Sequence, residues 1–397
     1  MQPVVRSLIL KRFRSVPSER IDFANPTFLV GRNGSGKSNL VNTFAFLSEA
    51  MTLQLQAVFD RRGGIAAVRN RTPGQSYPPN LGLGVIFGEL NGEILGGRYA
   101  FEVRALKNYG FEVVREQCRL RSRDGAVMWF DRQRGRFTSN ARGLEPSVDP
   151  ASLALPIVGG DARFSPALRT LSAMRVTSIE PSKVREMQDP DSGSTLRPDG
   201  SNAASVLQEI ERQRPEDVER VCEILATIVP NTMSVHTKKH GNKLSLVFTQ
   251  EWGKRKKLTF EAFNMSDGTL RAVGLLAAVF QRPAPSLLAI EEPEATIHPG
   301  ALGAVLDLLR HASKATQLVV TTHSPDVLDA KWIEEGSIRI VDWNEGATRV
   351  APLGAASRRA LREHLMGAGE LMRANALDSA PLFDENPERT SLFEENE

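Results

Sequence analysis

A loop that could bind phosphate is the clearest chemical feature of this sequence. Residues 31–38 read Gly-Arg-Asn-Gly-Ser-Gly-Lys-Ser and complete the pattern G-x-x-x-x-G-K-[ST]. Glycines at these spacings let consecutive backbone N–H groups converge on phosphate oxygens, and the start of a helix adds partial positive charge. Lys37 would reach the β- and γ-phosphates of a nucleotide, and Ser38 would hold Mg²⁺. The expected nucleotide contacts are Gly31, Asn33, Gly34, Ser35, Gly36, Lys37, Ser38 and Asn39.

The segments on either side of the loop support this interpretation. Asn25-Pro26 predicts a turn and Thr27–Val30 a short buried strand, while apolar residues at helical spacing predict a helix over 38–58. The alternative is a glycine-rich turn that binds nothing. The order strand, loop, helix favours phosphate binding, because this is the setting in which the motif works.

A second group of candidate residues follows an apolar stretch further along the chain. Ser286–Ile290 predicts a buried strand that ends in Glu291-Glu292-Pro293-Glu294. Glu291 would hold Mg²⁺ through a water, and Glu292 would be the base that orients the attacking water. The alternative is an acidic helix start, since a helix is predicted over 300–312. The phosphate loop upstream favours the catalytic interpretation.

Two further positions could act on a nucleotide. His323 follows a buried strand predicted over 316–321, where its side chain could contact the γ-phosphate and the attacking water. A purely structural histidine is the alternative. Ser266 and Gly268 precede a helix predicted over 269–280 and could form a second anion site, with an ordinary N-cap as the alternative.

The overall composition is that of an ordinary globular protein. The chain has 397 residues, of which 41% are hydrophobic and 24% charged, with a net charge of +3. Cys118 and Cys222 match no metal or redox spacing, which favours a reducing compartment. Since no apolar run approaches a membrane span, a cytoplasmic protein without membrane contact is expected. Basic residues within 238–257 could contact DNA phosphates, although solvated hairpin tips are the simpler explanation.

Strand and helix patterns divide the chain into one α/β unit with insertions. An N-terminal hairpin, with its turn at Pro17-Ser18, precedes the loop strand, and an antiparallel β meander is predicted over 81–131. Gly82 and Gly84 in this meander match no dinucleotide-binding fingerprint and are interpreted as structural. The other predicted regions are an insertion and helical region over 132–230 with a mobile loop at 189–202, a lobe over 231–342 with the signature, acidic strand and histidine, and a C-terminal helix and disordered acidic tail within 352–397.

Four elements in fixed order resemble the ABC-type ATPase family: the phosphate loop, a serine-glycine signature, an acidic strand and a switch histidine. The sequence is most similar to the SMC/RecF/OLD branch, because residues 265–269, Met-Ser-Asp-Gly-Thr, stand where transporters carry Leu-Ser-Gly-Gly-Gln. Residues 291–299, Glu-Glu-Pro-Glu-Ala-Thr-Ile-His-Pro, resemble that branch's acidic strand and D-loop. The resemblance implies an α/β fold, a P-loop ABC-type ATPase head over 1–397 with a mixed central sheet, the antiparallel meander and a helical subdomain.

The resemblance also implies how the site would work. Two copies would pair head to tail and sandwich two ATP molecules with Mg²⁺, each held by the phosphate loop of one copy and by Ser266 and Gly268 of the other. The implied catalytic residues are Lys37, Glu292 and His323, and the implied metal ligands are Ser38 and Glu291.

The sequence departs from the family pattern at two places. Glu291 stands where the family usually has aspartate, which lengthens the metal ligand by one methylene. The family's Q-loop glutamine has no clear counterpart among Gln54, Gln56 and Gln117.

These features predict an ATP-hydrolysing switch that acts in DNA repair or antiphage defence with a separate effector protein. The OLD branch adds a nuclease domain, which would need on the order of a hundred further residues. We expect any nuclease on another polypeptide, because the stretch after 342 is too short for one. Two alternatives are a nucleotide-binding subunit of a membrane transporter, disfavoured by the degenerate signature and the meander, and a non-hydrolysing scaffold, disfavoured by Lys37, Glu292 and His323.

Overall fold

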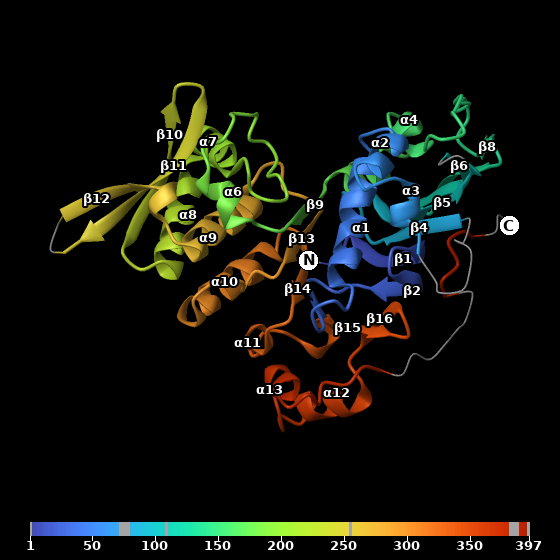
Figure 1. The fold of residues 1–397 in the computed structure, drawn as a ribbon. Helices are drawn as coiled ribbons and strands as arrows, with labels where there is room; N and C mark the ends of the chain where they lie inside the picture. The colour runs from blue at the N-terminus through green and yellow to red at the C-terminus, as the bar shows by residue number, and fades with distance from the viewer. Residues whose placement is uncertain (1, 71–79, 108–109, 254–255, 381–388, 395–397) are drawn as a thin grey trace.

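Three β-sheets organise the part of the chain that the computed structural model describes, which is residues 2–70, 80–107, 110–253, 256–380 and 389–394. A six-stranded sheet lies centrally, a seven-stranded sheet lies on one side of it, and a three-stranded sheet belongs to a helical lobe on the other side (Figure 1). The predicted α/β class, with a mixed sheet, an antiparallel sheet and a helical subdomain, is confirmed.

The central sheet has the order β16-β15-β3-β14-β13-β9 and is mixed in direction. Its strands are β3 (Thr27–Val30), β9 (Met174–Thr177), β13 (Leu287–Glu291), β14 (Gln317–Thr322), β15 (Ile338–Asn344) and β16 (Ala347–Pro352). Only the pair β15 and β16 is antiparallel among the pairings of these strands. Every residue of β3 and β14 is buried, because helices and the second sheet cover both faces.

Successive residues of the central strands enter different cores. Phe28 and Val30 pack with the helical lobe, whereas Leu29 between them packs with the antiparallel sheet and its helices. This alternation follows from the two-residue period of a strand. One short strand therefore joins both hydrophobic cores.

The antiparallel sheet has the order β2-β1-β4-β5-β6-β7-β8. Its strands are β1 (Val5–Phe13), β2 (Val16–Asp22), β4 (Asn80–Phe87), β5 (Ile94–Ala105), β6 (Phe111–Ser122), β7 (Val127–Gln133) and β8 (Arg136–Ser139). The meander predicted over 81–131 is present and continues into β8. The N-terminal hairpin is part of the same sheet, since β1 pairs with β4.

The predicted turn of the first hairpin is wrong by three residues. Phe13 pairs with Val16, so Arg14 and Ser15 form the turn, and Arg14 takes a left-handed φ of 49°. Pro17 lies inside β2, which is the edge strand, where its missing N–H costs no ladder hydrogen bond.

Helices cover the sheets and build the lobe. Five helices pack with the antiparallel sheet: α1 (Lys37–Ala50), α2 (Leu55–Asp60), α3 (Ile65–Val68), α4 (Leu155–Val158) and α5 (Ser165–Ser172). The lobe contains α6 (Pro181–Arg185), α7 (Ala203–Gln213), α8 (Pro215–Ile228), α9 (Asp267–Phe280), α10 (Pro299–Ala312) and the three strands β10 (Thr232–His240), β11 (Lys243–Trp252) and β12 (Lys256–Glu261). The C-terminal part holds α11 (Pro325–Leu328), α12 (Ala355–Arg362) and α13 (Ala368–Arg373), and short 3₁₀ turns occur at Ala262–Asn264 and Glu335–Ser337.

The helix predicted over 38–58 is two helices. The hydroxyl of Thr52 donates to the carbonyl oxygens of Ser48 and Glu49, at the end of α1. The chain then turns, and α2 packs back so that the rings of Phe46 and Phe59 lie 5.4 Å apart. A single straight helix would have carried Phe59 away from this core.

Two segments predicted to lack order have defined contacts. The side chain of Asn202 is buried and hydrogen-bonds Arg197, Asp191 and Thr195. These bonds hold the backbone of the loop 189–202 in a defined conformation. The mobility of this loop stays a prediction.

The prediction of a disordered acidic tail is wrong for residues 389–394, because Leu392 packs into the outer face of the antiparallel sheet. The rest of the predicted tail lies outside the described residues. Among the described residues, no helix is both long and apolar enough to cross a membrane.

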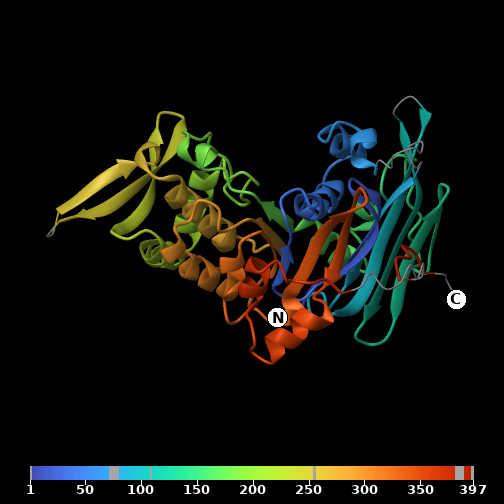
Figure 2. The same ribbon diagram turned by 60° about the horizontal axis from the view of Figure 1, so that its bottom comes forward.

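One buried glutamine joins the two large sheets, which stand beside each other in Figure 2. The side chain of Gln317, on β14, accepts a hydrogen bond from the backbone N–H of Val5 at 2.8 Å and donates one to the carbonyl oxygen of Val5 at 2.9 Å. The side-chain amide of Gln317 thus makes the two hydrogen bonds to Val5 that the backbone of a neighbouring β-strand would make. Gln317 is fully buried, so water cannot replace these bonds.

We expect Gln317→Leu to lower the free energy of unfolding by about 2–4 kcal/mol, because it leaves the buried N–H and C=O of Val5 unpaired. Urea unfolding followed by circular dichroism measures this. Gln208→Leu on the exposed side of α7 is the matched control and should change the free energy by less than about 0.5 kcal/mol. Equal effects of the two substitutions would contradict the bridging role.

Candidate nucleotide site

The phosphate-loop motif joins β3 to α1, as predicted. Gly34 and Gly36 have φ values of 81° and 102°, which only glycine adopts without strain. A Cβ atom at Gly31 would lie 2.1 Å from the carbonyl oxygen of Val341, and one at Gly36 would lie 2.0 Å from Oγ1 of Thr348. The hairpin of β15 and β16 therefore packs directly against the loop and fixes its shape.

Thr348 supports the loop and was not predicted from the sequence. Its hydroxyl donates to the carbonyl oxygen of Ser35 at 3.0 Å and lies 2.7 Å from the hydroxyl of Ser15. Asn39, an expected nucleotide contact, donates to Ser15 at 2.7 Å and accepts from Arg14 at 3.2 Å. The β1–β2 turn is thus tied to the first turn of α1.

Lys37 is folded back onto its own loop. Its ammonium group donates to the carbonyl oxygens of Gly31 and Arg32 at 2.7 and 3.0 Å. Burial lowers the pKa of Lys37, while the nearby carboxylates of Glu292, Glu294 and Glu291 oppose this shift. A phosphate group would supply the negative charge that this buried amine lacks in direct contact.

The rest of the loop has donors to offer a phosphate. Asn33 and Gly34 are exposed, and the hydroxyl of Ser35 is a buried group without a hydrogen-bond partner among the described residues. Buried polar groups are nearly always paired, so an unpaired hydroxyl inside a phosphate loop fits a missing anion.

The acidic strand lies beside the loop. The hydroxyl of Ser38 donates to Oε2 of Glu291 at 2.6 Å. Hydroxyl and carboxylate oxygens are ligands that Mg²⁺ prefers, with water and nucleotide phosphates completing its shell. The residues therefore fit the ion: Ser38 and Glu291 would hold Mg²⁺, which neutralises phosphate charge when bound. The longer glutamate reaches Ser38 without difficulty.

Glu292 and His323 meet at the ends of adjacent parallel strands. Nδ1 of His323 lies 3.1 Å from Oε1 of Glu292. Glu292 has a left-handed φ of 42°, and its N–H donates to the carbonyl oxygen of Thr321 at 3.1 Å. This turn directs the carboxylate toward the histidine at the end of β14. A carboxylate oriented by a histidine can accept a proton from water.

A buried arginine holds the backbone of the acidic turn. Arg271 on α9 donates to the carbonyl oxygens of Ile179, Glu291 and Glu292 at 2.9, 3.2 and 2.8 Å. Burial lowers its pKa, and the charges of Glu294 and Glu292 oppose that shift. The sequence contained one signal for this residue, namely a lone charge in the apolar run of α9.

Ser266 and Gly268 start α9 and lie apart from the phosphate loop in their contacts. Ser266 is the N-cap and accepts from the N–H of Thr269 at 3.2 Å, which was the structural alternative. A Cβ atom at Gly268 would lie 2.6 Å from the carbonyl oxygen of Thr296, so α9 packs closely on the segment after the acidic strand. No hydrogen bond among the described residues links this pair to residues 31–38. Figure 1 shows α9 in the lobe and α1 on the opposite side of β13 and β14.

The glutamine candidates and the basic region take other positions. Gln117 hydrogen-bonds Asp131 on the outer face of the antiparallel sheet, and Gln56 bonds Asp60 on α2, so neither contacts the loop. In the basic region, Lys238 pairs with Glu261 and Lys243 with Asp189. Lys239, Lys256 and Lys257 of the three-stranded sheet are also exposed. Lys254 and Arg255 lie outside the described residues.

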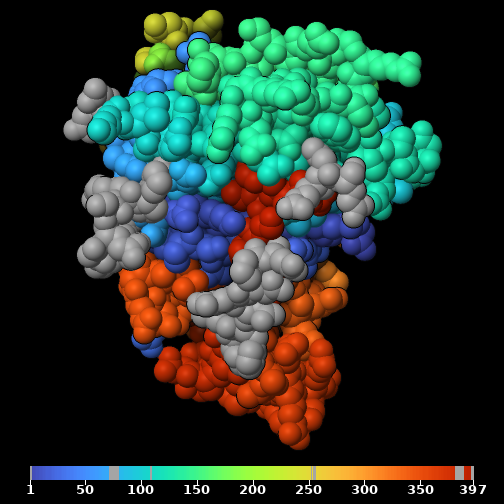
Figure 3. All heavy atoms as spheres, turned by 90° about the vertical axis from the view of Figure 1, so that its right-hand side faces the viewer, coloured from blue at the N-terminus to red at the C-terminus, as the bar shows by residue number. Residues whose placement is uncertain are grey.

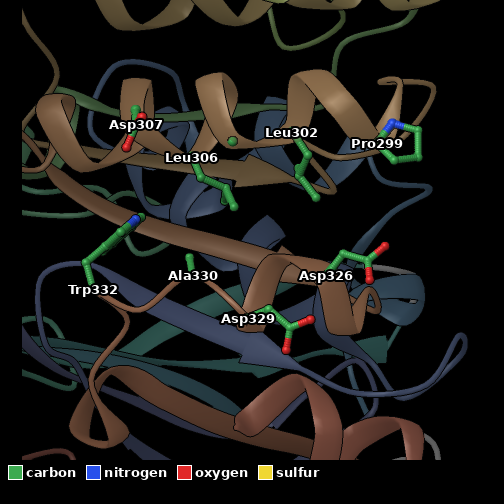
Figure 4. A pocket seen from close by; sticks show the side chains of 9 residues that line it. Pro299, Leu302, Leu306, Asp307, Asp326, Asp329, Ala330 and Trp332 are labelled. Carbon is green, nitrogen blue, oxygen red and sulfur yellow. The ribbon is translucent and has the colours of Figure 1, made fainter.

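A hollow of about 390 Å³ between α10 and α11 is a competing place for a ligand (Figure 4). Leu302, Leu306 and Trp332 form its apolar part, and Asp307, Asp326 and Asp329 its acidic part. Its described lining contains no lysine or arginine, and carboxylates repel phosphate. The phosphate loop is therefore the better candidate nucleotide site.

Comparisons with known proteins agree with this geometry. Residues 27–329 match the family described as "AAA domain, putative AbiEii toxin, Type IV TA system". The fold is similar to a crystal structure of the SmcHead bound to the C-winged helix domain of ScpA, with a TM-score of 0.57 and 17% identity, covering 91% of this chain and 100% of that chain. It is also similar to the Smc head domain with an extended coiled coil bound to the C-terminal domain of ScpA from Pyrococcus furiosus, with a TM-score of 0.55 and 15% identity, covering 92% and 100%.

None of the curated proteins compared with the chain is similar enough to count as a relative. The family match covers three quarters of the sequence and contains the phosphate loop, the acidic strand and His323. The chain belongs to the AAA-domain family of putative AbiEii toxins of type IV toxin–antitoxin systems, and its fold is that of the SMC-type ABC ATPase head.

Proposed function

We propose that this protein is an ATP-hydrolysing molecular switch whose complete sites form between two copies of the chain. The observation that carries the proposal is the contact of Glu292 with His323 beside the contact of Ser38 with Glu291, both next to the phosphate loop. A purely phosphate-binding loop would need no such second pair.

Each residue has a role that its contacts allow. Lys37 leaves the carbonyl oxygens of its loop and binds the phosphates, which compensates its buried charge. Ser38 and Glu291 hold Mg²⁺. Glu292 orients the attacking water and takes its proton, and His323 contacts the γ-phosphate. Arg271 keeps the backbone of Glu292 in place and is a positioning residue.

The start of α9 is the second half of the site. Fourteen residues long, α9 directs its free N–H groups and positive dipole end outward at Ser266 and Gly268. No hydrogen bond among the described residues links Ser266 or Gly268 to the loop of the same copy, and their proposed ligand is the γ-phosphate of ATP on a second copy. ATP then bridges two surfaces, and hydrolysis removes the bridging charge.

The biological setting is also a proposal, and the family description and the similar structures support it. Two similar Smc heads were crystallised with a domain of ScpA, a separate protein. The family description names a putative toxin. Both support a switch that acts with a separate effector in antiphage defence or DNA repair. A transporter subunit has less support, because the similar structures are Smc heads.

Contact with DNA belongs to the same proposal and concerns the exposed lysines of the three-stranded sheet. We expect replacing Lys239, Lys256 and Lys257 by glutamate to weaken duplex binding, and to reduce the slope of log K against log salt by about 2–3. Fluorescence anisotropy at several salt concentrations measures this. The control makes the same charge change at Lys107, Lys331 and Arg358, which are also exposed. Unchanged binding in the first variant would remove DNA contact from this surface.

Replacing the proposed base tests hydrolysis. We expect Glu292→Gln to reduce ATP turnover by at least about 100-fold, because the amide cannot accept the proton of water. ATP binding should remain, and the variant should form an ATP-dependent dimer by size-exclusion chromatography with light scattering.

Glu345→Gln is the matched control, since Glu345 lies in an exposed turn between β15 and β16. Its turnover should equal that of the unchanged protein. Equal turnover of Glu292→Gln and Glu345→Gln would remove Glu292 from the mechanism.

Mixing two inactive variants tests whether the site is shared. Lys37→Ala disables the loop of its own copy, and Ser266→Arg blocks the start of α9. We expect an equal mixture to recover about one quarter of the normal turnover, because half of random dimers are mixed and each has one intact site of two.

Lys37→Ala mixed with Glu292→Gln is the control. Both residues act on the same copy's ATP, so every mixed dimer has two defective sites and the mixture should stay inactive. Recovery in the control, or none in the test mixture, would contradict a site shared in this way.

A further inference from the structure

The outer face of the antiparallel sheet carries the C-terminal segment 389–394, which the proposed ATP switch does not use. In Figure 3 the red atoms of this segment lie in a hollow between the blue and the teal strands of the sheet. Only Leu392 of the segment is buried. The segment has neither helix nor strand, so side-chain contacts hold it.

A pit of small residues receives Leu392. Ile9, Gly84 and Ala100 are partners across β1, β4 and β5, so their outward positions form one row. A Cβ atom at Gly82 would lie 2.2 Å from Cδ1 of Leu392, and one at Gly84 would lie 3.2 Å from its Cδ2. Glycine inside a strand normally weakens it, and close approach of another chain segment explains the exception. The Gly82 and Gly84 pair thus has a use: it makes room for a leucine.

Gln117 continues this row and binds the backbone of the segment. It is the cross-strand partner of Ala100. Its Nε2 donates to the carbonyl oxygen of Glu394 at 2.9 Å, and its Oε1 accepts from the N–H of Glu394 at 3.0 Å. Nε2 also donates to Asp131, which fixes the amide's orientation. Such a two-point contact binds the peptide backbone whatever the side chain at that position is.

Arginines supply the specificity for acidic residues. Arg98 and Arg119 lie 3.7 and 3.4 Å from the carboxylate of Glu394, and Arg98 also donates to the carbonyl oxygen of Ser391. The guanidinium of Arg115 lies 4.5 Å from the ring centre of Phe393. The face therefore selects leucine in the pit and a carboxylate two residues later.

We propose that this sheet face is a peptide-recognition site and that the C-terminal segment is its resident, exchangeable ligand. The ligand class is a peptide segment that bends at a leucine and carries glutamate two residues later. Exchange is possible because the segment buries only one side chain among residues 389–394 and its ion pairs are partly exposed. The hydrogen bonds from Gln117 and Arg98 add to these contacts, and the local stability of the segment remains low. The tether to its own chain raises its effective concentration, so it excludes competitors until a partner segment of the same class binds more tightly.

The test uses a fluorescein-labelled peptide of residues 389–397, Arg-Thr-Ser-Leu-Phe-Glu-Glu-Asn-Glu. Its targets are the full chain and a full-length variant with Leu392→Asp and Glu394→Lys, which disables the resident segment. We expect the peptide to bind the variant at least about tenfold more tightly than the unchanged chain, by fluorescence anisotropy without nucleotide.

Two substitutions in the disabled-segment background test the site itself. Gly82→Ala fills the pit and should abolish binding, whereas Gly160→Ala, at an exposed glycine with open space around it, should not. Arg119→Glu, combined with Leu392→Asp alone so that the resident segment keeps Glu394, should weaken binding, and a peptide with lysine at the position of Glu394 should recover it. Thermal unfolding of each variant checks the fold, and the charge exchange remains informative if Gly82→Ala unfolds.

Several outcomes would overturn the proposal. These are equal binding to the unchanged chain and the disabled-segment variant, no binding to that variant, undiminished binding to folded Gly82→Ala, and no recovery on charge exchange. Since the measurement involves no ATP, its failure leaves the proposed hydrolysis untouched, and failure of hydrolysis leaves this site untouched.

Discussion

The parallel pairing of β13 with β14, next to β3, is the constraint on which the candidate site depends. Parallel strands place their carboxyl ends at one edge, so the loop after β3, Glu291 and Glu292 at the end of β13, and His323 after β14 lie together. Both faces of these strands are buried, which keeps the edge rigid. Positions more than 250 residues apart, Ser38 and Glu291, thereby come within 2.6 Å.

The carboxylates of Glu291, Glu292 and Glu294 concentrate negative charge at this edge. The neighbouring cationic side chains make their hydrogen bonds to backbone carbonyl oxygens. Arg271 donates hydrogen bonds to the backbone carbonyl oxygens of Glu291 and Glu292 there, while Lys37 donates to the carbonyl oxygens of its own loop. The carboxylates of Glu291, Glu292 and Glu294 all lie near enough to Lys37 to oppose the lowering of its pKa by burial. ATP with Mg²⁺ would complete the charge balance, and removal of the γ-phosphate would disturb it.

Two glutamine side chains take the place of a β-strand at positions where a sheet meets something other than a neighbouring strand. Gln317 pairs with Val5 and joins the two large sheets, and Gln117 pairs with Glu394 and receives the C-terminal segment. Gln317 is fully buried, so water cannot compete for its hydrogen bonds to Val5. Gln117 lies beneath residues 389–394, whose ion pairs with Arg98 and Arg119 are partly exposed. The same paired hydrogen bonds of a glutamine amide therefore join two sheets at Gln317 and, in our proposal, bind an exchangeable peptide segment at Gln117.

Much of the site could be predicted because its signals are local. Apolar residues predict a buried strand before each part of the site, namely the loop at 31–38, the acidic run at 291–294 and His323. The strand-loop-helix order and the antiparallel meander follow from spacing alone. The end of α1 was missed, since Thr52 and the packing of Phe59 on Phe46 override a continuous apolar pattern.

What only the tertiary structure decided are the contacts between distant segments. Nothing local shows that Thr348 would support Ser35, that Arg271 would hold the turn at Glu292, or that Leu392 would fill the space above Gly82. Sequence by itself determined which residues could do chemistry, because spacing along a strand or helix sets their direction. The tertiary structure decided which of them meet, because sheet order and close packing are set by the whole chain.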